Sequence, residues 1–188
     1  MKIKTILFFL SISLFMFGCK GTEKKNLQEV EKQELAKGIR CDSIFQGLYF
    51  GMSEPDFYAH CWKKNKEKIF AQALNMKVDY DLTHNESKFP LKINFFPMFA
   101  QEKIYEVPTH ITFLNTDYFN PEMKTDKLLI EVKKLMEKWY GEFFITPLPN
   151  GRNAYAQVLG NRRILIKVDK ENEVAVVFTD LTSGIKDN

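Results

Sequence analysis

The stretch Ile164-Leu-Ile-Lys-Val-Asp-Lys-Glu-Asn-Glu-Val-Ala-Val-Val-Phe178 predicts two antiparallel strands joined by a tight turn. Branched or aromatic residues occupy every second position on both arms, which is the period of a strand with one buried face. The polar segment 169–172 between the arms has the composition of a hairpin turn. This hairpin indicates a protein built on an antiparallel sheet.

Alternating apolar residues also occur earlier in the chain and predict further strands. The segments with this pattern are residues 78–82, 91–95 and 105–113, and strands are also expected at residues 143–148 and 154–159. A short strand is also expected at residues 45–50. Pro108 cannot donate a ladder hydrogen bond, so we expect the strand that contains it to lie at a sheet edge or to be interrupted by a bulge.

Two other segments have helical spacing and recognisable start signals. Ser53 and Asp56 stand in the capping relation S-x-x-D, which predicts a helix that begins at Ser53. Asn120 followed by Pro121 predicts the start of a second helix, and Gly141 predicts its end. We therefore expect an α+β fold in which two helices pack on antiparallel sheet.

The predicted elements run through a helix and three antiparallel strands twice, which is compatible with a tandem α-β-β-β repeat. This order resembles the tandem modules of β-lactamase-inhibitor proteins. A single such module also resembles small outer-membrane assembly lipoproteins. The resemblance covers the order of the elements alone, and it carries no functional residue to this chain.

The first nineteen residues have the pattern of an export signal. A basic start and an apolar run, too short to span a membrane, are followed by Gly18 and Cys19. Met16-Phe17-Gly18-Cys19 resembles the lipobox of bacterial lipoproteins, although leucine is commoner at its first position and alanine or serine at its second. The resemblance implies cleavage before Cys19, lipidation of Cys19 and membrane attachment through it. A plain secretory leader is the alternative.

The predicted boundaries divide the chain into four parts. These are the signal peptide, residues 1–18; the lipidated N-terminus and a flexible tether, residues 19–40; a single α+β domain, residues 41–183; and a disordered tail, residues 184–188. The tether is mostly charged, and as a flexible coil it would span roughly 25 Å. The lipobox resemblance implies a lipid-anchored protein of the cell envelope. Because no acidic cluster follows Cys19, we expect it at the outer membrane and facing the periplasm.

The charge balance argues against a nucleic-acid partner. The chain has 27 basic and 24 acidic residues, and removing the leader with Lys2 and Lys4 leaves 25 basic against 24 acidic. A net charge so close to zero provides no general attraction for a polyanion. The expected partners are the membrane, through Cys19, and an envelope protein or cell-wall component.

Cys41 and Cys61 remain once Cys19 is assigned to the anchor. An exported protein enters a compartment that permits disulfides, so a bridge between these two residues is one hypothesis. The other is that Cys61 is a small buried apolar residue and Cys41 a free thiol. The residue types leave both open.

No motif for catalysis, metal binding or cofactor binding is present. His60, His84 and His110 lack the short spacings of sequence-local zinc sites, and the chain has no phosphate-binding glycine loop or nucleophile elbow. Residues 169–173 lack the glycine that a calcium loop needs. We therefore expect a non-catalytic protein without metal or cofactor. The alternative is a small periplasmic hydrolase whose site is assembled only in the fold.

Residues Phe95-Phe-Pro-Met-Phe99 place apolar side chains on both faces of one predicted strand. Either this strand is covered on both faces, or one face binds a partner through Phe96, Met98 and Phe99. An exposed aromatic patch or an open strand edge would favour a binding module, whereas a pocket of polar side chains with perturbed pKa values would favour an enzyme. A structural spacer would have neither. The leading hypothesis is a binding module.

Overall fold

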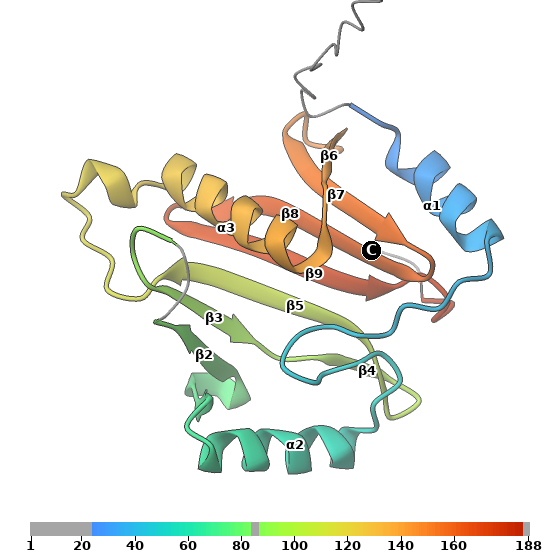
Figure 1. Ribbon diagram of the computed structural model, residues 1–188, viewed down its shortest axis with the longest axis horizontal. Helices are drawn as coiled ribbons and strands as arrows, with labels where there is room; N and C mark the ends of the chain where they lie inside the picture. The colour runs from blue at the N-terminus through green and yellow to red at the C-terminus, as the bar shows by residue number, and fades with distance from the viewer. Residues whose placement is uncertain (1–23, 84–86, 186–188) are drawn as a thin grey trace, which may run out of the picture.

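The structure is a computed structural model that describes residues 24–83 and 87–185. Cys19 and the whole predicted signal peptide lie outside these residues, as does His84. Within the described residues, three α-helices accompany one sheet of nine strands, all paired antiparallel (Figure 1). The α+β class is therefore confirmed.

The helices and strands have the following bounds. The helices are α1 (Leu27–Ala36), α2 (Glu54–Lys66) and α3 (Thr125–Tyr140), with short 3₁₀ turns η1 (Leu74–Met76) and η2 (Pro121–Met123). The strands are β1 (Phe70–Gln72), β2 (Val78–Leu82), β3 (Leu91–Phe95), β4 (Met98–Ala100), β5 (Lys103–Phe113), β6 (Phe144–Pro147), β7 (Asn153–Leu159), β8 (Arg162–Lys170) and β9 (Glu173–Asp180).

The predicted C-terminal hairpin is confirmed as β8 and β9. Ile164 lies opposite Phe178 and Ile166 opposite Val176, and all four side chains are buried. The register shifts between Val168 and Lys170, which marks a β-bulge just before the turn. The buried side chains of the two arms thus form part of the hydrophobic core.

The strand order shows two halves of similar topology. The order across the sheet is β1-β2-β3-β5-β9-β8-β7-β6, so each half is a meander of four strands, and the last strands of the two halves pair with each other. A helix precedes each meander, α2 in the first half and α3 in the second. In the first half the prediction missed the short strands β1 and β4, whereas the four strands predicted after the second helix are all present as β6 to β9.

One face of the sheet carries the hydrophobic core. Helix α3 packs on this face with Leu128, Val132 and Met136 fully buried. The segment 41–53 covers the neighbouring part of the same face, and both lie in front of the strands in Figure 1. Residues 45–50 do not form the predicted strand, because Phe45 turns inward to contact Phe95 and Phe178.

The prediction of a flexible tether over residues 19–40 is wrong for residues 27–36, which form α1 beside β7. Glu31 pairs with Arg163 at 3.0 Å, and Glu34 accepts a hydrogen bond from the amide of Gly160. Helix α1 has no buried residue. Hydrophobic periodicity cannot reveal a helix that is held by polar contacts, which is why the sequence pattern missed it.

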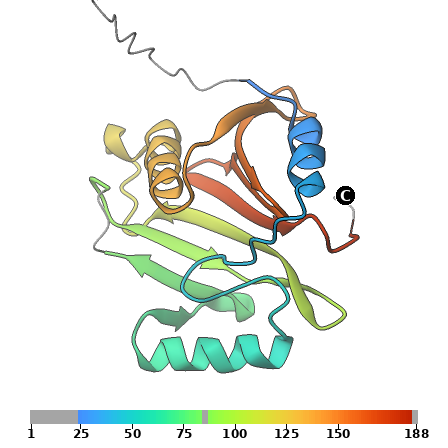
Figure 2. The ribbon, with the colours of Figure 1, turned by 45° about the vertical axis from the view of Figure 1, so that its right-hand side comes forward.

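The chain next to α1 is also fastened to the second half of the sheet. Lys24 forms a parallel bridge with Ile145 of β6. Gly160 has a φ of 58°, and a β-carbon at this position would lie 2.2 Å from the carbonyl oxygen of Ile39. The close approach at this turn therefore requires glycine. Figure 2 shows α1 beside the second half of the sheet, well away from α2.

Pro108 lies in the central strand β5, at a point where β5 has no paired strand on one of its two sides. Strand β5 pairs with β3 up to Thr109 and resumes with β4 at Glu106, so residues 107–108 have no strand partner on that side. The residues facing this gap, 96–97, include Pro97, which also lacks an amide hydrogen. The predicted interruption of pairing at Pro108 is therefore present, and it separates β3 from β4.

Candidate functional site

A groove runs between α2 and the edge strand β1, and we call it the α2–β1 groove. Its volume is about 440 Å³. It is lined by Phe57, Tyr58, Cys61, Trp62, Asn65, Phe70, Ala71, Gln72, Met76, Lys77 and Val78. Most of these side chains are apolar, and among the lining residues that the structure describes, Lys77 is charged and none is acidic.

Large apolar side chains around this groove are exposed to solvent. Trp62 is 65% exposed, Met76 67% and Leu74 87%. Tyr58, one helical turn before Trp62, is also exposed. Asn75 and Met76 have positive φ angles, which turn the chain sharply at η1. Soluble single chains seldom group exposed apolar side chains in this way without a partner.

Helix α2 begins as the sequence predicts, but it buries little of its surface. The side chain of Ser53 accepts a hydrogen bond from the amide of Asp56, which confirms the predicted cap. Phe57 is the buried residue of this helix. Because α2 lies at the edge of the sheet rather than across it, Tyr58 and Trp62 remain on the surface.

The groove lies beside an open strand edge. Among the described residues, β1 is the terminal strand of the sheet and pairs with β2 on one side. On its other side, the side-chain amide of Asn65 donates to the carbonyl oxygen of Phe70 at 3.1 Å. An exposed aromatic patch and an open strand edge therefore occur together, and these are the two features expected of a binding module.

The predicted partner site at Phe96, Met98 and Phe99 is divided by the structure. Phe96 and Phe99 are half-buried and make edge-to-face contacts with Phe57, at ring distances of 5.8 and 5.9 Å. Met98 alone of the three is exposed, and Tyr105 Oη donates to its sulfur. The three predicted residues therefore do not share one exposed surface, because Phe96 and Phe99 pack against Phe57 of α2, a residue that lines the groove.

Of the two hypotheses for Cys41 and Cys61, the structure has the unbridged one, and both thiols are free. Cys41 is fastened near the β7–β8 turn, where its amide donates to Asn161 Oδ1. Cys61 instead lines the α2–β1 groove, and burial raises the pKa of its thiol to about 11. The helix that carries Cys61 lies at the opposite edge of the sheet, so the two residues do not meet.

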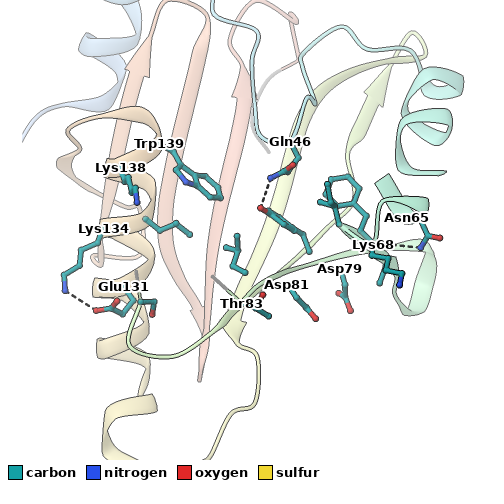
Figure 3. A pocket seen from close by; sticks show the side chains of 17 residues that line it. Gln46, Asn65, Lys68, Asp79, Asp81, Thr83, Glu131, Lys134, Lys138 and Trp139 are labelled. Atoms are coloured by element: carbon teal, nitrogen blue, oxygen red, sulfur yellow. Dashed lines mark hydrogen bonds and ion pairs between the residues drawn. The ribbon is translucent and has the colours of Figure 1, made fainter. Parts of the chain in front are cut away.

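A larger, more polar cleft lies between α3 and the β1–β2 hairpin, with a volume of about 980 Å³ (Figure 3). Gln46 donates a hydrogen bond to Tyr80 Oη at 2.6 Å within it. Burial raises the pKa of Tyr80, and the bond from Gln46 opposes this in part. Lys134 pairs with Glu131 on the α3 wall. These groups can orient a polar ligand.

The described histidines do not form a nucleophile–base pair. His60 Nε2 lies 2.9 Å from the carbonyl oxygen of Gln46, and burial lowers its pKa. His60 is therefore a packed residue. His110 Nδ1 lies 2.8 Å from Glu173 Oε1. Both imidazoles thus face carbonyl or carboxylate oxygens, whereas acyl transfer would need a hydroxyl or thiol at this distance.

One cluster of metal-ligand type lies outside both clefts. It joins His110 to Asp169 and Glu173 at the β8–β9 turn. These residues were not predicted to meet, because His110 is far from the other two in the sequence. The sequence did show a histidine on a predicted strand and acidic residues at alternate positions of a predicted hairpin. These residues come to share one face of the sheet only when the strands pair, and the sequence pattern does not give that pairing.

Some groove residues had a weak signal in the sequence. Tyr58 and Trp62 are four residues apart, and they lie beside the stripe that Phe57 begins. A helix with apolar residues on so wide an arc must bury more than one side or expose some of it. Leu74 and Met76 had no such signal, because their exposure depends on the turn at η1.

None of the helices in the described residues is long and apolar enough to span a membrane. The comparisons with family models, with curated proteins and with solved structures all found no match to this chain.

Proposed function

We propose that this protein is a lipid-anchored, non-catalytic binding module of the cell envelope, and that it holds an apolar segment of a partner protein in the α2–β1 groove. The observation that carries the proposal is the exposure of Trp62, Met76 and Leu74 around a groove that borders an open strand edge. Tryptophan and tyrosine side chains often contribute most of the binding energy of a protein interface, and methionine is common at adaptable binding surfaces.

The charges around the groove define the chemistry of the partner segment. Lys77 lines the groove, and Lys66 Nζ lies 5.3 Å from the centre of the Trp62 ring. Lys63 is exposed in the last turn of α2. Such a basic rim favours an apolar segment that is flanked by acidic side chains.

The attachment of Lys24 to the sheet indicates how the groove would be oriented relative to the membrane. Lys24 is bridged to Ile145 on β6, at the end of the sheet opposite β1. Five residue steps separate Cys19 from Lys24, and a fully extended chain of that length reaches at most about 18 Å. A lipid at Cys19 would therefore keep the β6 end near the membrane, and the α2–β1 groove would face away from it (Figure 1).

The groove is tested by photo-cross-linking in cells with a benzophenone amino acid at position 62. A matched probe replaces Phe119, which is 96% exposed and outside the groove lining. We expect one dominant adduct from position 62, whose cross-linked peptide is apolar with acidic flanks, and no such adduct from position 119. The same adducts from both positions would contradict the proposal.

The groove also has a built-in reporter, because Cys61 lines it. The raised pKa of about 11 makes alkylation of this thiol slow at neutral pH, and a bound partner segment would shield it further. A synthetic peptide with the sequence identified by cross-linking should slow alkylation of Cys61 and leave the rate at Cys41 unchanged. Equal protection of the two thiols would place the peptide elsewhere.

The anchor is tested separately through Cys19. Cys19→Ser should move the protein from the membrane fraction to the soluble fraction, because several acyl chains are needed for durable attachment. Intact-mass spectrometry of the wild type should find an acylated N-terminus at Cys19. An unacylated mature terminus, or cleavage at another position, would overturn the lipoprotein assignment and leave the groove proposal standing.

A further inference from the structure

The face of the sheet opposite α3 carries three side chains that converge near the β8–β9 turn. They are His110 on β5, Asp169 on β8 and Glu173 on β9, and one potential ligand atom from each lies within 4.8 Å of the others. We propose that these three residues bind a divalent transition-metal ion such as Zn²⁺.

Strand register brings the three residues together. His110 lies opposite Ala175, and Glu173 is two residues before Ala175, so Glu173 and His110 point to the same face. Asp169 is two residues after Lys167, whose partner is Ala175, so alternation places Asp169 on the same face as Glu173. The pairing of β8 with β9 also shifts at Asp169, between Val168 and Lys170, and such bulges are common next to functional sites.

The distances suit a metal ion. His110 Nδ1 lies 2.8 Å from Glu173 Oε1 and 3.8 Å from Asp169 Oδ2. A tetrahedral zinc ion with bonds of about 2.0–2.1 Å holds its ligand atoms roughly 3.3 Å apart. Small side-chain rotations would therefore bring the three atoms to bonding distance, with the remaining position open to water.

A metal ion would also bind all three ligand atoms of the cluster at once, which a single proton on the imidazole cannot do. Both carboxylates face the same imidazole nitrogen, and one N–H group can donate well to only one of them. The nitrogen and two oxygens together could instead each donate a lone pair to one cation. Two carboxylates and a neutral imidazole also carry enough negative charge to offset most of a divalent ion.

The lysines near the cluster leave the binding position open. Lys170 Nζ lies 3.2 Å from Glu173 Oε2, so it holds the oxygen that does not face His110 and helps to aim Oε1 at the imidazole. The Lys170 side chain is 69% exposed, and solvent therefore screens much of its charge. Lys167 lies on the same face, opposite Ala175, and has no direct contact with the three ligand atoms among the described interactions.

The ligand set points to a particular class of metal. One imidazole nitrogen with two carboxylate oxygens suits Zn²⁺ and related divalent transition metals, whereas Ca²⁺ prefers oxygen ligands alone and Cu⁺ prefers sulfur. Asp169 is exposed, so an ion can reach the site from solvent. This site is independent of the α2–β1 groove, because it lies on other strands.

The test uses calorimetric titration of chelator-treated mature protein with Zn²⁺ alone. We expect one ion per chain, and His110→Ala, Asp169→Asn and Glu173→Gln should each weaken binding by at least about tenfold. Asp81→Asn is the matched control, since Asp81 is an exposed acid of β2 outside the cluster, and it should bind as the wild type does. Circular dichroism checks that each variant is folded.

Imidazole NMR signals provide a second measurement that does not depend on the variants. Adding Zn²⁺ should shift the ring signals of His110 and leave those of His60 unchanged, because His60 lies near Gln46 and far from the cluster in sheet order. Absence of Zn²⁺ binding by the wild type would overturn the proposal. Unchanged affinity in all three variants would overturn it too, since the ion would then bind elsewhere.

Discussion

The β1 end of the sheet and the region of the β7–β8 turn differ in the kind of side chain that lies in an unusual environment. At the β1 end, Trp62 and Met76 are apolar and exposed. Near the β7–β8 turn, Asn161, Arg162 and Asp180 are polar and buried, with exposed fractions of 1%, 5% and 8%. The first arrangement leaves apolar area in water, and the second removes polar groups from it.

The difference lies in whether the fold supplies a partner. Asn161 donates to Asp42 Oδ1 at 3.0 Å and to Asp180 Oδ1 at 3.1 Å, while Arg162 donates to the carbonyl oxygen of Ser43 at 2.7 Å. These bonds fasten the segment before α2 to the sheet. The exposed side chains at the β1 end have no comparable role in the fold, which is why we assign them to binding.

The largest expected effect is at Phe57, where the exposed end is joined to the core. Phe57→Ala should lower the free energy of unfolding by about 3–5 kcal/mol, because the ring is 1% exposed and contacts both Phe96 and Phe99. A urea melt measures this loss. Tyr58→Ala on the same helix should lose less than about 1 kcal/mol. Equal losses for both variants would mean that α2 has no single anchor.

A smaller loss is expected when the buried polar region is disturbed. Asn161→Ala removes the acceptor of the Cys41 amide and two donated bonds, which should cost about 2–3 kcal/mol. Thermal unfolding compared with Asn153→Ala, an exposed asparagine of β7, measures the difference. A loss no larger than that of the control would show that the polar cluster does not fasten the segment.

Asp180 should make the stability of this region depend on pH. Burial by itself would raise its pKa, but hydrogen bonds from Thr182 and Asn161 and the charge of Arg40 outweigh burial and lower the pKa. The folded pKa is then below the unfolded one, so the stabilisation is present above about pH 4 and is lost as the pH falls through the folded pKa.

Asp180→Asn measures that contribution. The variant should lose about 1–2 kcal/mol of unfolding free energy at pH 7, and the gap to wild type should narrow below about pH 4. Urea melts at several pH values give the comparison. A gap of constant size across this range would mean that the charge of Asp180 contributes nothing.

The smallest expected effect on stability is at Trp62. Trp62→Ala should stay within about 0.5 kcal/mol of wild type, because the ring is 65% exposed. The same change should abolish capture of the partner peptide by the groove, measured by fluorescence anisotropy of a labelled peptide. A large loss of stability would instead make Trp62 part of the core and weaken the contrast between the two regions.

At Phe96 the local sequence pattern predicts the direction of the side chain but not whether it is buried. Its parity opposes that of Phe95, and the pattern correctly indicates that the two rings face different ways. Whether Phe96 meets water or another element depends on where α2 docks. In the fold it meets Phe57, so truncation should cost more than an ordinary surface change and less than the loss at Phe57 itself.

The sequence by itself determined the elements whose pattern is local. The β8–β9 hairpin, the strands β2 and β3, the cap at Ser53 and the stripe of α3 follow from periods of two and about 3.6 residues, which neighbouring residues set without reference to the rest of the chain. The α+β class follows from these elements.

Only the tertiary structure decided what lies between the elements. Helix α1 is held by a pairing of Glu31 with Arg163, and the cluster of His110, Asp169 and Glu173 depends on the register of three strands. The α2–β1 groove depends on α2 lying at the sheet edge. Each of these rests on contacts between residues far apart in the chain, and such contacts leave no periodic signal in the sequence because their energy comes from the partner and not from the neighbours.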